Sequence, residues 1–300
     1  MDDRGHLTTE QRNPRSTGLS RMSIGEAFDL INTEDRLVAD AVRDARSEIV
    51  AAIEAVVSAF RSGGRLVYLG AGTSGRLGVL DAAECPPTFL SDPNMVVGMI
   101  AGGSDALTRS IEGAEDCPQD AGGEIDRLDV SQNDVVLGIA TGGTTAYVHA
   151  GLRRAKERGA TTVLFACVPK DEVQDDADIS IRVITGPEVL TGSTRMKAGT
   201  ATKMVLNMIS TVAMVRIGKV HENLMVDVHT EGNRKLVDRG IRIISELTGS
   251  PREESRALLE RAGGKVKTAI VMHKTGASCR RAEAMIADAS GSVSSLIGEP

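Results

Sequence analysis

The chain has 300 residues, of which 41% are hydrophobic and 25% are charged, a composition typical of a globular protein with a full apolar core. A net charge of -6 and an aromatic content of 2% argue against a basic, base-stacking surface, so we expect no nucleic-acid partner. No apolar run is long enough to cross a bilayer and the first 20 residues carry no signal peptide, so we expect a cytoplasmic protein without a membrane partner.

The predicted elements begin after an irregular, polar stretch of residues 1–22. A helix is predicted to start near residues 32–35, to bury one apolar face and to end at Gly63-Gly64. Five short β-branched runs then alternate with helical segments: Leu66–Leu69, Met95–Ile100, Val135–Ala140, Thr162–Ala166 and Ile179–Ile184. Such runs are typical of strands buried on both faces of a sheet. We therefore predict an α/β fold with a doubly wound, five-stranded parallel sheet that binds ligands at the carboxyl ends of its strands.

The chain is predicted to be helical beyond residue 196. The segment Ala198–Val215 is long, rich in Ala and Met, and apolar almost all round, which is typical of a helix that is buried or lies at a subunit interface. Residues 240–300 are more charged, and we expect helices there that are interrupted at Gly249, Gly263-Gly264 and Gly276.

A glycine-rich turn, Gly70-Ala71-Gly72-Thr73-Ser74-Gly75-Arg76, follows the first predicted strand and opens a helix. Glycines let the backbone approach a ligand, and a helix N-terminus offers free N–H groups to an anion. The spacing matches the dinucleotide motif G-x-G-x-x-G, but Asp92 precedes the second strand, at the wrong end of the sheet to hold a ribose. Gly72 and the hydroxyls of Thr73 and Ser74 suit a terminal phosphate instead. We favour a phosphomonoester over NAD, and over a purely structural turn.

A second turn rich in glycine and hydroxyl groups, Thr141-Gly142-Gly143-Thr144-Thr145, follows the third predicted strand. Two such turns at one sheet edge could converge on one anion, which makes Thr141 and Thr144 further candidate phosphate ligands. The alternative is that both turns are ordinary helix starts with structural glycines.

Two acidic segments are candidates for acid–base chemistry. Glu84 lies between Ala82-Ala83 and Cys85-Pro86-Pro87, so we expect it to be partly buried. Glu112 and Glu115 follow the second predicted strand and are expected to share a helix face, from which either could point toward the strand ends. From spacing alone, solvated helix charges remain the default interpretation.

We expect no metal site and no disulfide. The zinc-helix pattern H-E-x-x-H fails at His221-Glu222-Asn223-Leu224-Met225, because Met225 stands where the second histidine belongs. The cysteines are far apart in the sequence, so we expect reduced thiols at Cys85, Cys117, Cys167 and Cys279.

These residues resemble the N-acetylmuramic acid 6-phosphate etherase family. The resemblance rests first on the stretch Gly70–Gly78 and on Asp81-Ala82-Ala83-Glu84-Cys85-Pro86-Pro87-Thr88. It extends over nearly the whole chain, through residues 7–14, 100–103, 112–116, 192–200, 206–208, 223–228 and 267–272.

The resemblance implies a sugar isomerase (SIS) domain in a homodimer. It implies cleavage of the lactyl ether of N-acetylmuramate 6-phosphate, a small-molecule sugar phosphate, in cell-wall amino-sugar catabolism and recycling. It implies that no cofactor is needed and that Glu84 and Glu115 form the acid–base pair. On the basis of this resemblance, we divide the chain into an N-terminal arm and helix (1–56), the SIS domain (57–220) and a C-terminal helical region (221–300).

This chain departs from the family pattern at two places. The family commonly has Ala-Ser-Gly-Arg-Thr-Pro-Tyr after the third strand, and here Thr141–Tyr147 lacks that serine and arginine. A second variation surrounds Asn233. Two other functions remain open, a non-catalytic sugar-phosphate sensor that regulates a sugar kinase and an aldose–ketose isomerase. The presence of both Glu84 and Glu115 favours the etherase over the sensor.

Overall fold

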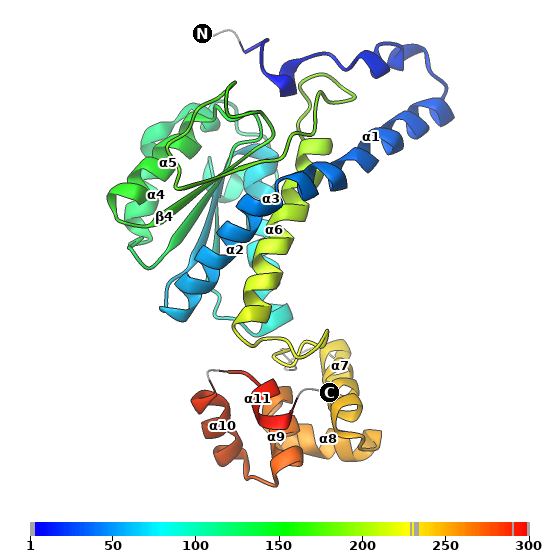
Figure 1. Cartoon of the computed structure of the whole chain (residues 1–300), viewed down its shortest axis with the longest axis vertical. Helices are drawn as coiled ribbons and strands as arrows, with labels where there is room; N and C mark the ends of the chain where they lie inside the picture. The colour runs from blue at the N-terminus through cyan, green and yellow to red at the C-terminus, as the bar shows by residue number, and fades with distance from the viewer. Residues whose placement is uncertain (1–3, 229, 231–233, 290, 299–300) are drawn as a thin grey trace. The chain divides into compact units, whose positions relative to one another are not determined.

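A five-stranded parallel sheet with the order β2-β1-β3-β4-β5 lies between layers of helices (Figure 1). The computed structural model describes residues 4–228, 230, 234–289 and 291–298. The strands are β1 (Leu66–Gly70), β2 (Val96–Ile100), β3 (Val135–Ile139), β4 (Thr161–Ala166) and β5 (Ile179–Arg182). Every residue of β1 and β3 is buried, as expected for central strands covered on both faces. The predicted doubly wound α/β fold is confirmed.

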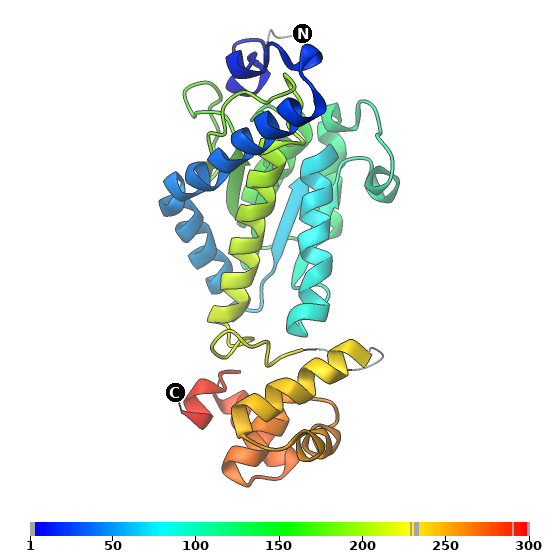
Figure 2. The same ribbon diagram turned by 90° about the vertical axis from the view of Figure 1, so that its right-hand side faces the viewer.

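Helices cover both faces of this sheet. On one face lie α4 (Pro118–Arg127) and α5 (Ala146–Glu157), which pack on Val67 and Leu69 of β1. On the other face three helices lie side by side (Figure 2), namely α2 (Arg46–Arg61), α3 (Gly72–Phe89) and α6 (Lys197–Arg216). Because successive residues of a strand point to opposite faces, Tyr68 faces this second layer. The predicted long helix at residues 198–215 is α6.

The N-terminal arm is more regular than the sequence predicted. It contains three short 3-10 helices, η1 (Thr8–Glu10), η2 (Pro14–Ser16) and η3 (Leu19–Arg21). The single helix expected from about residue 32 to Gly63-Gly64 is two helices, α1 (Ile24–Asp44) and α2, which ends at Arg61. The first of them begins at Ile24 and not near residue 32. The reason is a capping box, in which Ser23 Oγ accepts from the Glu26 N–H at 3.3 Å and the Glu26 carboxylate accepts from the Ser23 N–H at 2.7 Å.

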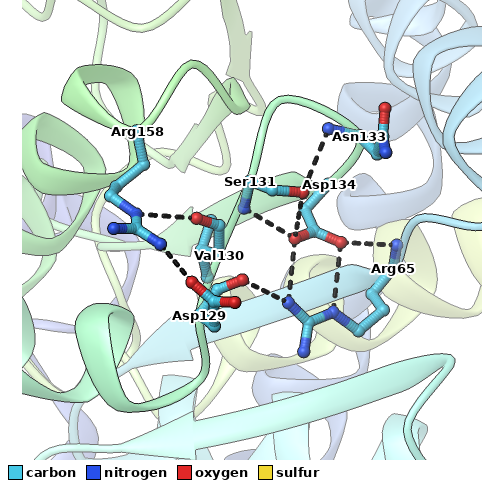
Figure 3. Close-up of polar contacts among 7 residues, drawn as sticks. All are labelled: Arg65, Asp129, Val130, Ser131, Asn133, Asp134 and Arg158. Carbon is cyan, nitrogen blue, oxygen red and sulfur yellow. Dashed lines mark hydrogen bonds and ion pairs between the residues drawn. The ribbon is translucent and has the colours of Figure 1, made fainter.

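The amino ends of β1 and β3 are joined by a buried carboxylate (Figure 3). Asp134, 2% exposed, accepts hydrogen bonds from the Arg65 N–H at 2.8 Å, from Arg65 Nη2 at 2.9 Å and from the Ser131 N–H at 2.9 Å. Burial raises the pKa of Asp134, but these hydrogen bonds outweigh it, so the pKa lies below its ordinary value. This cluster stabilises the sheet at the edge opposite to the carboxyl ends of the strands.

Contacts divide the chain into two compact units, residues 1–83 with 94–210 and residues 84–93 with 211–300. The second unit contains α7 (Arg234–Thr248), α8 (Arg252–Arg261), α9 (Val266–Thr275), α10 (Cys279–Asp288) and α11 (Ser294–Ile297). Its own apolar core includes Ile244, Leu258 and Ile270. The predicted glycine breaks separate α7 from α8, α8 from α9, and α9 from α10, with φ values between +61° and +77°.

The three-part division into 1–56, 57–220 and 221–300 stays a prediction. None of the helices in the described part of the chain has the length and apolar character that a bilayer crossing requires. The variation around Asn233 lies outside the described residues.

Candidate active site

The turn after β1 brings backbone segments closer together than side chains would allow. A Cβ atom at Gly70 would lie 2.7 Å from Gly75 N, and one at Gly75 would lie 2.6 Å from Ile100 Cγ1. Gly72 has a φ of +53°, in the left-handed region, and is the first residue of α3. The helix therefore starts directly at the carboxyl edge of the sheet, where its first N–H groups lack intrahelical acceptors.

A cavity of about 180 Å³ lies beside this turn. It is lined by Ala71, Gly72, Arg76, Ala101, Ala106 and residues 110–115. Gly72, a predicted phosphate ligand, and Glu115, a predicted catalytic carboxylate, thus share one cavity. Two sequence segments that are far apart in the chain meet here because β1 and β2 are neighbours, with Gly70 opposite Ile100.

The segment that carries Glu115 is not the helix that the sequence predicted. Glu115 lies in η5 (Ala114–Asp116), a single 3-10 turn, and Glu112 lies in the turn before it. The expectation that Glu112 and Glu115 share a helix face is wrong, because Gly113, with a φ of +74°, separates them. Both side chains are exposed, and both residues line the cavity.

Thr73 and Ser74 follow Gly72 in the first turn of α3 but do not line the cavity. Thr73 is half-buried and Ser74 is 8% exposed. A Cβ atom at Gly199 would lie 3.7 Å from Thr73 Cγ2, so the beginning of α6 packs beside the turn. Their role as phosphate ligands stays a prediction.

The second predicted turn lies next to the first. β1 pairs with β3, with Gly70 opposite Ile139, so both turns leave adjacent strands at the same edge. This is the point at which the strand order of the sheet reverses, where doubly wound folds bind ligands. Thr141 and Thr144 are half-buried there. The Thr141 carbonyl accepts from the Cys167 N–H at 2.8 Å, and Thr144 lies in the loop before α5.

Glu84 lies on α3 and is exposed, so the expectation of partial burial is wrong for the single chain. Its neighbours Ala82 and Cys85, which are 7% and 2% exposed, occupy the buried face of the helix, and Glu84 therefore points away from it. α3 continues through Pro86 and Pro87 to Phe89 and does not bend back at these prolines.

Comparison with known proteins identifies the family. The chain is 56% identical over 273 residues to the N-acetylmuramic acid 6-phosphate etherase of Crocosphaera subtropica, which covers 91% of this chain and 89% of that relative. It is 52% identical over 286 residues to the etherase of a Synechocystis species, with 95% and 93% covered. This chain belongs to the N-acetylmuramic acid 6-phosphate etherase family.

Comparisons with domain models and with solved structures agree with the fold described above. The SIS domain model matches residues 118–212, and the model of the glucokinase regulatory protein N-terminal SIS domain matches residues 48–156. A Bacteroides fragilis structure described as a phosphosugar isomerase involved in capsule formation aligns with a TM-score of 0.51 at 19% identity. It covers 69% of this chain and 98% of that one, and it supports the fold alone.

Sequence reasoning missed two polar residues of α3, of which Arg76 lines the cavity and Asp81 anchors the helix. Arg76 lines the cavity, and its place in the motif, four residues after Gly72, was the available signal. Asp81, 6% exposed, accepts from Tyr68 Oη at 2.7 Å, from Asn207 Nδ2 at 2.6 Å and from Ser210 Oγ at 3.1 Å. It fixes α3 to β1 and α6. The sequence signal for Asp81 was an aspartate that stands alone in an apolar helical run.

The described residues contain no cluster of three or more His, Cys, Asp or Glu side chains that could hold a metal ion. None of the cysteines at positions 85, 117, 167 and 279 forms a disulfide in the structure.

Proposed function

We propose that this protein cleaves the D-lactyl ether of N-acetylmuramate 6-phosphate and releases N-acetylglucosamine 6-phosphate and D-lactate. The observation that carries the proposal is the identity above 50% to etherases over more than nine-tenths of the chain. The cavity that joins Gly72 to Glu115 at the carboxyl edge supports it, because such an edge suits a phosphorylated ligand.

The chemistry requires an acid and a base but no cofactor. The open-chain sugar carries an aldehyde at C1, which acidifies the proton on C2. A base removes that proton, the C3–O bond breaks as an acid protonates the departing lactate oxygen, and an unsaturated aldehyde remains. Water then adds its hydroxyl at C3 and a proton returns to C2. The net reaction is hydrolysis of the ether, in which each group acts once as acid and once as base.

We assign Glu115 as the base at C2. We assign Glu84 as the acid at C3 and as the base for the returning water. Glu115 shares its cavity with the turn that starts α3, which supports a place near a substrate held there. For the phosphate we propose the backbone at Gly72 with the hydroxyls of Thr73 and Ser74. Thr141 and Thr144, on the adjacent loop, would add contacts from the neighbouring strand end.

We propose further that the site is shared between two copies of the chain. Glu84 lies ten residues beyond Ser74 on one helix, which corresponds to about 15 Å along the axis of α3. One sugar phosphate does not span that distance between its phosphate and its C3 oxygen. Because α3 does not bend back, Glu84 would serve the phosphate turn of a partner subunit, and its exposure fits that role.

A homodimer would also cover apolar side chains that are exposed in the single chain. Large apolar side chains that would otherwise face water lie on α1, α3 and α6: Ile24 92%, Phe28 65%, Leu80 54%, Met208 40%, Val212 39% and Val215 40% exposed. Exposed apolar groups on helices are typical of protein–protein contact. Cytoplasmic cell-wall recycling is the setting that we propose for this dimer.

The experiment is to incubate the purified protein with N-acetylmuramate 6-phosphate and assay free D-lactate. Lactate release supports the etherase, whereas binding without release would favour the sugar-phosphate sensor, and conversion to a ketose would favour an isomerase. The glucokinase regulatory protein match covers only the SIS domain, so it does not favour a sensor over the etherase.

Two variants separate the roles of the glutamates. Glu84→Gln and Glu115→Gln should each abolish lactate release with the fold intact. In deuterated water, the Glu84 variant should still exchange the C2 proton of N-acetylglucosamine 6-phosphate, and the Glu115 variant should not. The opposite pattern would exchange the two roles.

Mixed dimers test the shared site. The test uses a substrate concentration below the raised KM of the Thr73→Ala/Ser74→Ala chain, at which this chain alone has little activity. Combining it with an inactive Glu84→Gln chain should recover part of the activity, because one of the two mixed sites would be intact. If heterodimers form and no activity returns, each site takes Glu84 from its own chain.

A further inference from the structure

Arg76 connects the two walls of the cavity beside the first glycine turn. It lies one helical turn after Gly72 on α3, and both residues line the cavity. Its guanidinium donates from Nε to the Leu107 carbonyl at 3.2 Å and from Nη2 to the Arg109 carbonyl at 2.8 Å. One side chain of α3 therefore holds the backbone of the opposite wall at two points.

The opposite wall has little regular structure of its own. η4 (Gly103–Leu107) ends at the first of these contacts, and the chain then passes through turns to η5. Carbonyl groups at the end of a helix lack intrahelical donors, so the guanidinium satisfies groups that need a partner. Residues 110–115, which follow the second contact directly, all line the cavity. Their position relative to α3 therefore depends on where Leu107 and Arg109 are held.

We infer that Arg76 is a positioning residue for Glu115, because it fixes the segment Leu107–Asp116 against the turn that starts α3. The planar guanidinium reaches two carbonyls at once, which the single ammonium of a lysine on a flexible stem does not do with the same geometry. We call the two hydrogen bonds from Arg76 to Leu107 and Arg109 the clamp. The effect on catalysis rests on the proposed function, whereas the clamp itself does not. Displacement of a catalytic group by about 1 Å can lower a rate by about a hundredfold.

The kinetic test uses Arg76→Met and Arg76→Lys. The matched control is Arg109→Met, which removes an exposed arginine charge from the same segment but keeps the carbonyl that Arg76 binds. We expect kcat for D-lactate release to fall about tenfold to a hundredfold in both Arg76 variants, with KM within about twofold, because Thr73 and Ser74 are unchanged. The control should keep wild-type kcat.

A double-variant cycle ties the effect to Glu115. Glu115→Asp shortens the carboxylate and is expected to leave measurable activity. If Arg76 acts by placing Glu115, Arg76→Met should lower kcat much less in the Glu115→Asp background than in the wild-type chain. Independent effects that multiply, accompanied by a fall in melting temperature, would show a general structural role and overturn the inference.

Hydrogen–deuterium exchange gives a readout that does not depend on activity. Loss of the two hydrogen bonds should speed exchange in peptides from residues 107–116 by about tenfold, whereas β1 and β3 stay protected. Unchanged exchange in this segment, or the same kcat loss in Arg109→Met, would refute the clamp. If the unaltered protein released no D-lactate, the proposed function would fail, and exchange would still decide the clamp.

Discussion

The buried carboxylate of Glu34 holds the N-terminal arm, α1 and α6 together, and we predict a large cost for removing its charge. The Glu34 side chain is fully buried, and Oε2 accepts from Lys197 Nζ at 2.9 Å and from Asn13 Nδ2 at 2.9 Å. Arg15 Nε donates to Oε1. Lys197 is 1% exposed. Glu34→Gln keeps the shape of the side chain and leaves the buried ammonium without the carboxylate that contacts it.

The size of this loss in stability follows from the contacts of the Glu34 carboxylate. The hydrogen bond from Arg15, supported by Lys197 and Asn13 and opposed by burial, lowers the pKa of Glu34 from 4.5 to about 2. At 1.36 kcal/mol for each pH unit between these values, the charged form stabilises the fold by about 3 kcal/mol at pH 7. Removing one partner of a buried ion pair costs about 3–5 kcal/mol, which agrees with that figure.

The assay is urea unfolding followed by circular dichroism at pH 7, 5 and 3. Because the pKa of Glu34 is lower in the folded state, its stabilisation is fully present above about pH 4.5 and is lost as the pH falls toward 2. The free energy of unfolding of Glu34→Gln should thus lie about 3 kcal/mol below wild type at pH 7, with a smaller gap at pH 3. Acid effects of other carboxylates are common to both proteins and cancel.

The matched control is Asp29→Asn, which removes an exposed charge from the same helix and should change stability by less than about 0.5 kcal/mol. Equal destabilisation by both variants, or a gap for Glu34→Gln that does not change with pH, would refute the reasoning.

Three further predictions concern the turns and the sheet edge. Thr73→Ala/Ser74→Ala should raise KM for the phosphorylated sugar, because the anchoring hydrogen bonds to the phosphate are removed. Steady-state kinetics measure this KM, and an unchanged value would mean that the phosphate binds elsewhere. Gly75→Ala should lower the free energy of unfolding, measured by thermal unfolding, by about 1–3 kcal/mol, because the added Cβ would lie 2.6 Å from Ile100 Cγ1. The control Gly123→Ala in α4, where nothing lies within 4 Å of the added Cβ, should be neutral or stabilising. Asp134→Asn should lower the free energy of unfolding by about 2 kcal/mol, because it weakens the hydrogen bonds to Arg65 and Ser131. It should leave kcat unchanged at 25 °C, since the cluster in Figure 3 lies at the amino edge of the sheet. A loss of kcat without a loss of stability would contradict this prediction.

The sequence alone was sufficient for the strands, for the glycine breaks of the C-terminal helices and for the etherase family. Strand signals were strong because β1 and β3 are buried on both faces, which requires continuous apolar runs. The turn at Gly70–Gly75 was recognisable because the close backbone contacts there admit glycine alone at two positions. The start of α1 was missed although its capping box is a local signal in the sequence.

Tertiary structure decided what surrounds each candidate carboxylate. The burial of Glu84 depends on which face of α3 packs inward, and Asp81, Ala82 and Cys85 take that face. The loss of helix around Glu115 follows from Gly113, and its place in the cavity follows from the pairing of β1 with β2. The contacts of Arg76 with Leu107 and Arg109 join residues about thirty positions apart. Local sequence patterns record which residues favour a helix, strand or turn, whereas such contacts arise only when the packed sheet brings distant segments to the same edge.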